Sequence, residues 1–332
     1  MKQLKQTTLR RLISLAMLLV LILLFTVLSG TSFLSWSNLV EILRDASVVA
    51  IIGVGVTMVI ITSGIDLSTG SAMALVGMVI ANIYRYTLWP IPVMILVGVA
   101  VGVICGVING LIVAKLNIPE FIGTLATMSI YRALTYVIAI RDANGSIISQ
   151  PLTYSTYVYW SWALGPLYIV TFAMIAFIVV GQVVLKKTRF GTNLYAVGAN
   201  RKAAQLSGID VAKTRIIAYA ITGFCVAIGA VFTTARLQST TALLGDGFEF
   251  DPIAAAVVGG VSLAGGSGDA IGTLIGAIFM SVLSNGVLKL NMNTAFQYII
   301  KGVIIIAVVM FDSAYKARMD KLAKERGAKD GA

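Results

Sequence analysis

The residues that could do chemistry are concentrated in two polar interruptions of an otherwise apolar chain. Residues 62–71, TSGIDLSTGS, place one carboxylate, Asp66, among several hydroxyl groups and two glycines. Residues 259–269, GGVSLAGGSGD, follow a short apolar run that opens with Asp251 and Pro252. In a membrane, backbone that is not helical is tolerated only where protein or a water-filled cavity satisfies it. Both interruptions are therefore candidates for a transport pathway or gate.

Charged and amide side chains inside apolar segments extend this candidate set, because such groups are costly in hydrocarbon and usually face the protein interior. Asp66 has a second interpretation as a cap of the helix that follows it. Arg132 and Lys301 could pair with acids or line a polar route, and Lys301 could also extend toward the membrane surface. The candidates for a pathway or gate are Ser63, Asp66, Ser68, Asn109, Arg132, Asp251, Asn285 and Lys301.

The sequence offers no catalytic set. It contains no histidine, and its two cysteines, Cys105 and Cys225, both lie in apolar segments. It has no G-x-x-x-x-G-K-[ST] phosphate loop, no G-x-S-x-G and no paired-cysteine metal spacing. We therefore predict no enzyme activity, no metal site and no cofactor, and any ATP must be bound by another chain.

The elements that position these residues are predicted to be membrane-spanning helices. Of the 332 residues, 58% are hydrophobic and 12% are charged, and the mean hydropathy is +0.93. Soluble domains have about 25% charged residues. Apolar runs near the roughly 20 residues of one span recur along the chain. The prediction is an all-α polytopic membrane protein with about ten spans, in which helices are broken or short near 62–71 and 252–269. The predicted spans are 12–29, 46–62, 70–88, 91–114, 119–140, 164–185, 214–235, 252–265, 270–288 and 296–313.

The distribution of positive charge predicts the orientation. With the N-terminus in the cytoplasm, 18 basic residues fall in inside segments and 5 in outside loops. Both termini are then cytoplasmic, including a basic tail at 314–332. The net charge of +11 follows from this topology, so we expect contact with membrane lipid and none with nucleic acid.

Glycines recur every four residues in two of the predicted spans. Gly98, Gly102, Gly106 and Gly110 share one helix face, as do Gly268, Gly272 and Gly276. Small residues at this spacing allow helix backbones to approach closely in lipid. The pattern predicts two tight helix contacts.

The basic segment 186–215 is the longest polar interval on the predicted cytoplasmic side. Its middle favours a short helix, with Asn200 as the N-cap, Ala203, Ala204 and Leu206 as helix formers, and Gly208 as the stop. Such a helix could contact a soluble partner and transmit its movement to the membrane spans. The alternative is a basic loop that only fixes topology, and the residues alone leave both open.

Several motifs in order resemble the membrane-spanning permeases of ribose-type bacterial ABC sugar importers. They are TSGIDLSTGS at 62–71, AKLNIPEFIGTLATM at 114–128, TRFGTNLYAVGANRKAAQLSGI at 188–209, GFEFDPIAAAVVGGVSLAGGSG at 247–268 and GTLIGA at 272–277. The resemblance covers roughly residues 40–313. It implies one transmembrane permease domain over 1–332, in a bacterial inner membrane, that carries a monosaccharide into the cytoplasm.

The resemblance also implies partners. They are a second permease copy or a paralogue, cytoplasmic ATP-binding subunits and an extracytoplasmic sugar-binding protein. It favours ATPase coupling through the cytoplasmic segment, by Arg189, Phe190, Gly191, Tyr195, Gly198, Asn200, Ala203, Ala204, Leu206, Ser207 and Gly208. The alternative function is an ion-coupled secondary sugar transporter, which needs intramembrane acids such as Asp66, Asp251 and Asp269.

Overall fold

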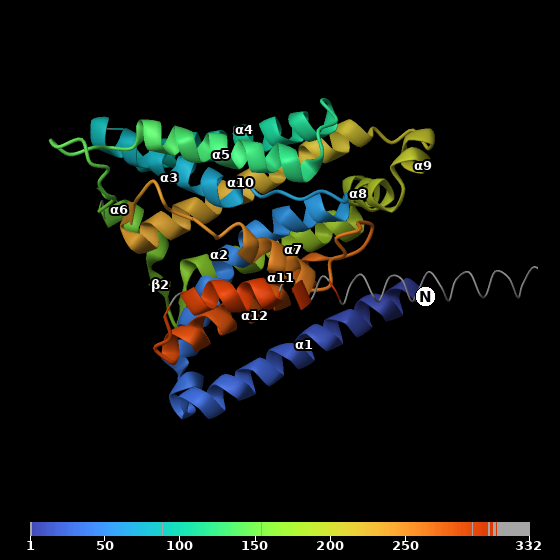
Figure 1. The fold of residues 1–332 in the computed structure, drawn as a ribbon, viewed down its shortest axis with the longest axis horizontal. Coiled ribbons are helices and arrows are strands. Elements are labelled where there is room, and N and C mark those ends of the chain that lie inside the picture. The colour runs from blue at the N-terminus through green and yellow to red at the C-terminus, as the bar shows by residue number, and fades with distance from the viewer. Residues whose placement is uncertain are drawn as a thin grey trace, which may run out of the picture.

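Long helices run along the longest axis of the molecule in the computed structural model (Figure 1). The structure describes residues 2–87, 89–153, 155–293, 295–304, 306–307 and 310. The predicted tail at 314–332 lies outside the described residues. The helices are α1 (Lys2–Ser29), α2 (Trp36–Ile61), α3 (Thr69–Tyr86), α4 (Ile91–Ala114), α5 (Glu120–Ile138), α6 (Ser155–Val158), α7 (Ile169–Lys187), α8 (Arg189–Ala199), α9 (Arg201–Leu206), α10 (Val211–Leu237), α11 (Phe250–Val258) and α12 (Ala270–Lys289), with 3-10 turns η1 (Thr31–Leu34) and η2 (Tyr159–Ser161). A further helix covers Ala295–Ile304.

Seven of the described helices are long and apolar enough to cross a membrane: Arg11–Ser29 of α1, α2, α4, α5, α7, α10 and α12. The predicted count of about ten is not reached in the part of the chain that the structure describes. The predicted span 70–88 corresponds to α3, which has 18 residues and includes the polar Asn82 and Arg85. The predicted span 252–265 shortens to the 9 residues of α11. The predicted span 296–313 continues past the described residues.

Two predicted boundaries were wrong for identifiable reasons. Helix α2 begins at Trp36 and not at 46, because the charged residues Glu41, Arg44 and Asp45 end the apolar run but continue the helix and find ionic partners. The span predicted from 164 begins at Ile169, because residues 163–168 form the antiparallel pair β2 (Ala163–Leu164) and β3 (Leu167–Tyr168).

The core is built around α2 and α10. In the apolar window of α2, 83% of the residues are buried, against 17% in α1 and 28% in α4 and α5. The outer helices leave large apolar side chains exposed, such as Leu19 and Val27 of α1 and Val137 of α5. This distribution suits a lipid environment, where exposed apolar side chains on outer helices are not penalised.

Both predicted interruptions are present. Residues 62–68 connect α2 to α3 without helix, and residues 259–269 connect α11 to α12 without helix. The two segments touch, because Gly266 N–H donates to the carbonyl of Ile61 at 2.9 Å and Ser63 Oγ donates to the carbonyl of Ala264 at 2.9 Å. Neighbouring protein thus satisfies backbone and hydroxyl groups that lipid could not.

The glycines of α4 lie at tight helix contacts, as predicted, and so do Gly272 and Gly276 of α12. Gly268 was wrongly assigned to the same helix face, because it lies before α12 in the second interruption at φ 140°. A Cβ on Gly102 would lie 2.6 Å from the carbonyl oxygen of Gly223, so α4 and α10 approach too closely for a side chain there. A Cβ on Gly272 of α12 would overlap the carbonyl oxygen of Gly259. These contacts fix α4 against α10 and α12 against the end of α11.

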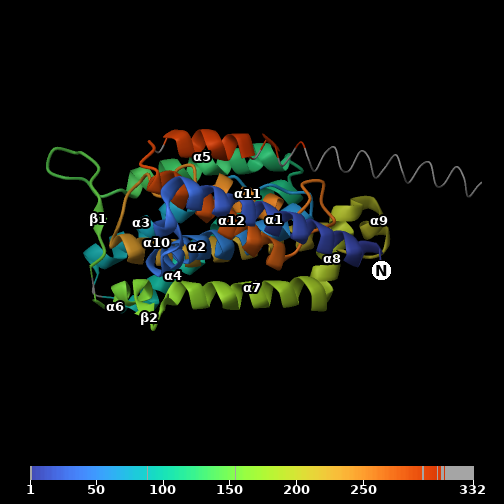
Figure 2. The same ribbon diagram turned by 90° about the horizontal axis from the view of Figure 1, so that it is seen from below.

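The molecule has two distinct ends (Figures 1 and 2). Helices α8 and α9 lie at one end, where α1 also begins. At the other end lie residues 139–168, with α6, β2 and β3, and strand β1 (Gln150–Pro151), which pairs antiparallel with β4 (Ser239–Thr240). We call these the α8–α9 end and the loop end.

Candidate functional site

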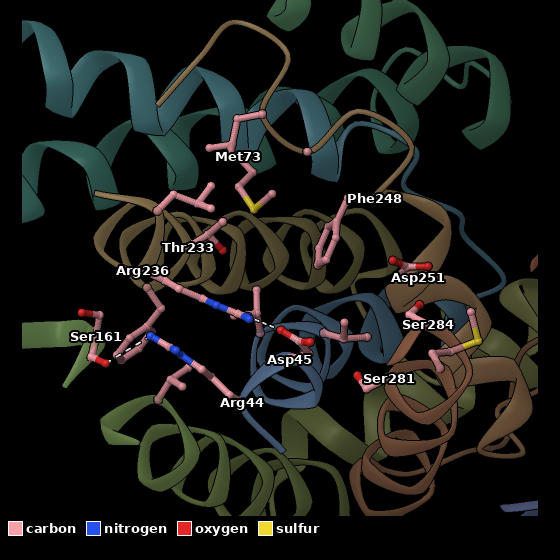
Figure 3. Close-up of a pocket in the computed structure, with 18 of the residues that line it drawn as sticks. Arg44, Asp45, Met73, Ser161, Thr233, Arg236, Phe248, Asp251, Ser281 and Ser284 are labelled. Carbon is pink, nitrogen blue, oxygen red and sulfur yellow. Dashed lines mark hydrogen bonds and ion pairs between the residues drawn. The ribbon is translucent and has the colours of Figure 1, made fainter. Parts of the chain in front are cut away.

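A cavity of about 440 Å³ lies between α2, α3, α10 and α12, toward the loop end. Figure 3 shows that Arg44, Ser161 and Arg236 lie toward one side of it, while Phe248, Asp251 and Ser284 lie toward the other. The lining is mixed, with apolar, charged and hydroxyl side chains. The polar and aromatic lining residues include Arg44, Asp45, Trp160, Ser161, Thr233, Arg236, Asp246, Phe248, Asp251, Ser281 and Ser284.

A charge network lies at the loop end of this cavity. Arg236, at the end of α10, pairs with Asp45 of α2 and lies 3.3 Å from Glu41. Arg44 of α2 lies 3.5 Å from Glu41 and donates to the carbonyl of Ser161 at 3.3 Å. The network ties α2 to α10 and to the loop end, so separating these elements would break several ionic contacts together.

Residues 241–249 form an irregular segment that connects β4 to α11 and lines the cavity. Arg132 of α5 holds this segment by donating from Nη1 to the carbonyls of Ala242, at 2.6 Å, and Leu244, at 3.0 Å. Its Nη2 lies 3.8 Å from Asp246. The Arg132 side chain is only 15% exposed, which agrees with the prediction that its charge faces the interior. Arg132 therefore supports the cavity wall and does not line the cavity.

Asp251 and Lys301 form an ion pair of 2.8 Å at the start of α11. Their side chains are 12% and 14% exposed, so the Lys301 charge also faces the interior. Asp251 lines the cavity, and it alone does so among the eight predicted pathway residues. Because Lys301 balances its charge, Asp251 contributes no net charge to the cavity lining.

Asp66, Ser68 and Asn109 meet in a buried hydrogen-bonded cluster away from the cavity lining. One carboxylate oxygen of Asp66 accepts from Ser68 N at 2.9 Å, Ser68 Oγ at 2.8 Å and Asn109 Nδ2 at 3.2 Å. Tyr131 donates to Asn109 at 3.2 Å. Asp66 precedes the N-cap residue Ser68 of α3 and bonds to it, so it orders the turn into α3 without acting as the cap itself.

The two remaining pathway candidates occupy other places. Ser63, at φ 62°, bonds to Ala264 where the two interruptions touch. Asn285 of α12 accepts from Asn38 Nδ2 at 3.0 Å, on the side of α2 near η1. Neither lines the cavity.

At the α8–α9 end, the predicted short helix is present as α9. Asn200 accepts from Ala203 N at 3.0 Å as the N-cap, and Gly208 adopts φ 83° after the helix, as predicted. A second helix, α8, was not predicted. Thr188 caps it by accepting from Gly191 N at 3.1 Å, and Leu194 and Val197 are its buried residues with Gly191.

The predicted coupling residues divide by exposure. Leu206 is 90% exposed, whereas Ala204 is only 4% exposed and faces its own chain. The surface of α9 therefore presents Leu206 and leaves Ala204 inside. The exposed coupling residues are Arg189, Asn200, Ala203, Leu206, Ser207 and Gly208, the half-buried ones are Phe190, Tyr195 and Gly198, and the buried ones are Gly191 and Ala204.

Helix α8 rests on both interruptions. The carbonyl of Gly198 accepts from Ser63 Oγ at 3.4 Å in the first interruption. A Cβ on Gly198 would overlap the carbonyl oxygen of Ile61 at the end of α2, so this glycine permits close packing. Tyr195 donates to the carbonyl of Gly268 at 2.7 Å. Burial raises the pKa of Tyr195, which keeps the phenol protonated as a donor. A displacement of α8 would therefore reach both irregular segments directly.

Glu120, in the first turn of α5, joins α9 to α10. It accepts from Arg201 of α9 at 2.6 Å and pairs closely with Arg215 of α10. Arg201 also reaches the carbonyl of Thr62 at 3.4 Å. Arg201 is therefore a tether between α9 and the first interruption.

Sequence reasoning missed most of the cavity. Thr233, Ser281 and Ser284 carry no local signal, because single hydroxyl residues in apolar helices are common. Glu41, Arg44 and Asp45 did give a signal, as charges beside an apolar run, but it was interpreted as the end of the helix. Among the described residues, no group of three or more His, Cys, Asp or Glu side chains could hold a metal ion.

These features define a polytopic, predominantly helical membrane protein. The family model described as "Branched-chain amino acid transport system / permease component" matches residues 38–309, and the chain belongs to this family. It is 40% identical to the ribose import permease protein RbsC of Escherichia coli strain K12 over 303 residues, covering 90% of this chain and 92% of that protein.

Two other relatives agree. The chain is 37% identical to RbsC of Bacillus subtilis strain 168, over 89% of this chain and 90% of that protein. It is 38% identical to the galactose/methyl galactoside import permease protein MglC of Escherichia coli strain K12, over 90% of this chain and 93% of that protein. These relatives are transport permeases. No solved structure matched the chain.

Proposed function

We propose that this chain is the membrane-spanning subunit of an ATP-driven importer that carries a monosaccharide across a bacterial inner membrane. The observation that carries the proposal is the similarity, at 37–40% identity over about nine tenths of the chain, to ribose and galactose import permeases. The absence of a phosphate loop from the sequence fits a subunit whose ATPase is a separate chain.

In this proposal the α8–α9 end is cytoplasmic and the loop end is extracytoplasmic. The basic segment 186–215 supports that orientation through the positive-inside rule, with both termini in the cytoplasm. The chain acts as one permease domain over residues 1–332 with about ten membrane segments. In that count the buried α3 and α11, and the helix that begins at Ala295, join the seven longer spans.

The partners follow from the same proposal. Cytoplasmic ATPase subunits contact the exposed face of α9 at Ala203 and Leu206, and a sugar-binding protein docks at the loop end. A second copy or a paralogue completes the membrane unit, in contact with lipid on its outer helices. ATPase motion acts on α8, which rests on the carbonyl of Ile61 and on Gly268, and so reaches the two interruptions.

The three acids that the sequence offers for ion coupling argue against the ion-coupled alternative. Asp251 is paired with Lys301, Asp269 is paired with Arg11 at 2.6 Å, and Asp66 accepts hydrogen bonds from Ser68 and Asn109. An acid that binds and releases a coupling ion needs a free carboxylate within reach of water. These three acids are instead committed to structural partners.

The proposal is tested by purifying the chain with its partner ATPase in lipid nanodiscs. We expect a stable complex whose ATP hydrolysis rises when sugar-loaded binding protein is added. A chain that purifies without any ATPase, and whose presence leaves the hydrolysis rate of the ATPase unchanged, would contradict the proposal.

A further inference from the structure

Three hydroxyl groups at the cavity differ from the other hydroxyls of the helices that carry them. Thr222 and Thr234 of α10 donate to the carbonyls of Ala218 and Ala230, four residues back, which is the usual way to satisfy a hydroxyl inside a helix bundle. By contrast, Thr233 of α10 and Ser281 and Ser284 of α12 make no hydrogen bond to any other residue that the structure describes.

These three hydroxyls line one space. Ser281 and Ser284 are three residues apart and therefore share one face of α12. Thr233 approaches the cavity from α10, and all three belong to its lining. Thr233 and Ser284 are half-buried and Ser281 is buried, and each hydroxyl lines the cavity without a partner in the described protein. Polar groups in a protein interior normally have a hydrogen-bond partner, so a ligand or water in the cavity is the partner available to these hydroxyls.

The remaining lining narrows the chemistry of that ligand. Figure 3 shows Asp251 beside Ser284, and Phe248 also belongs to the cavity lining. An aromatic ring offers a flat apolar surface, and a carboxylate offers hydrogen-bond acceptors. A cavity of about 440 Å³ lies in the size range of small-molecule sites.

The charges of the lining disfavour an anionic or zwitterionic ligand. Arg44 and Arg236 line the cavity, but they are held by Glu41, by Asp45 and by the carbonyl of Ser161. A carboxylate ligand would find no free cation there to replace its water shell. A neutral molecule with several hydroxyl groups needs none.

We propose that this cavity is a substrate-binding site of the permease itself, in which Thr233, Ser281 and Ser284 hydrogen-bond to the hydroxyl groups of a neutral sugar that packs on Phe248, with Asp251 as a further acceptor. The inference rests on the proposed import function and adds to it. It makes the permease a second point of sugar selection after the binding protein, and it excludes a branched-chain amino acid from this cavity.

The test is protection of an introduced cysteine. Ser284→Cys in the full chain, in nanodiscs, is labelled with a small charged methanethiosulfonate reagent, alone or with D-ribose, D-galactose or L-leucine. We expect one of the sugars to slow labelling by about fivefold at a concentration near four times its Kd, because labelling then follows the unoccupied fraction. L-leucine should leave the rate unchanged.

Two controls define the background. The wild-type chain measures labelling of Cys105 and Cys225, which are 4% and 1% exposed. Ser146→Cys, in the exposed loop 141–146, lies outside the cavity lining and should label equally with and without sugar. Thr233→Cys serves as the second reporter if Ser284→Cys does not fold.

A transport measurement completes the test. The combined variant Thr233→Val, Ser281→Ala and Ser284→Ala should lower the maximal uptake rate of the assembled importer without changing the binding-protein concentration that gives half of that rate. Protection by L-leucine, or no protection by any sugar together with wild-type uptake in the combined variant, would overturn the inference. The proposed function would survive that result, because it is tested by a different observation, which is whether the wild-type complex imports sugar.

Discussion

Nζ of Lys301 lies 2.8 Å from Oδ1 of Asp251, and this ion pair joins helix Ala295–Ile304 to the first turn of α11. Removing one partner of a buried pair leaves an uncompensated charge, which costs about 3–5 kcal/mol. Replacing both partners with uncharged groups of similar shape costs much less. Single and double variants of this pair can therefore distinguish the effect of the unpaired charge from the effect of lost packing.

We expect Lys301→Met to lower the thermal unfolding midpoint of the detergent-solubilised protein strongly. The double variant Lys301→Met with Asp251→Asn should recover most of that loss, because no buried charge then lacks a partner. Unfolding is followed by circular dichroism or intrinsic fluorescence. Equal losses in the single and the double variant would show that Asp251 is not charged and paired as the structure has it.

The contact between α4 and α10 predicts a steric effect. A Cβ on Gly223 would overlap the carbonyl oxygen of Gly102, so Gly223→Ala should force the two helices apart and destabilise the protein by about 1–3 kcal/mol, as overpacking does. Gly302→Ala is the matched control, because in the part of the chain that the structure describes no atom outside its own helix backbone lies within 4 Å of the added Cβ. A midpoint that falls equally in both variants would mean that helix propensity, and not the close approach, decides the effect.

The exposure of α9 predicts which residue contacts the ATPase. Leu206 is 90% exposed, so Leu206→Asp should leave the yield and unfolding midpoint of the permease unchanged and abolish copurification with the ATPase. Ala204 is 4% exposed, so Ala204→Glu should reduce the yield of folded permease itself. If Leu206→Asp still copurifies fully with the ATPase, α9 is not the contact.

The tether at Arg201 predicts an effect on coupling. Its ion pair with Glu120 is half-exposed, and such pairs contribute only about 0.2–1 kcal/mol to stability. We therefore expect Arg201→Ala to change the unfolding midpoint little but to lower the sugar imported per ATP hydrolysed, because α9 loses its link to α5 and to Thr62. The exposed neighbour Lys202→Ala should leave this ratio unchanged. If Lys202→Ala lowered the sugar imported per ATP and Arg201→Ala did not, Arg201 would not be a tether.

Much of the architecture could be predicted because it has local causes. Apolar runs of membrane length, the Asn200 cap, the Gly208 stop and the glycine spacing of α4 each act within one or two turns of helix. Both interruptions were also visible, since Asp66 and the glycines at 265–268 break the apolar pattern. The structure agrees with these expectations at α9, at 62–68 and at 259–269.

The candidate site could not be predicted in the same way. Ser281, Ser284 and Thr233 face one cavity only because α12 and α10 both pack against α2, and no local sequence pattern encodes that packing. Helix α8 was missed because its buried residues are few and basic residues flank it. Asp66 and Asn109 were correctly chosen as interior polar groups, but the contacts between them, and not a ligand, satisfy them.

ATP-driven uptake in proteoliposomes tests the central claim most directly. The chain is reconstituted with its ATPase inside and the sugar-binding protein outside, and uptake of radiolabelled D-ribose or D-galactose is measured. The account predicts uptake of one of these sugars that requires ATP, the ATPase and the binding protein, and none from a proton or sodium gradient alone. Uptake by the permease alone under an ion gradient, without ATP, would contradict the account and identify an ion-coupled transporter.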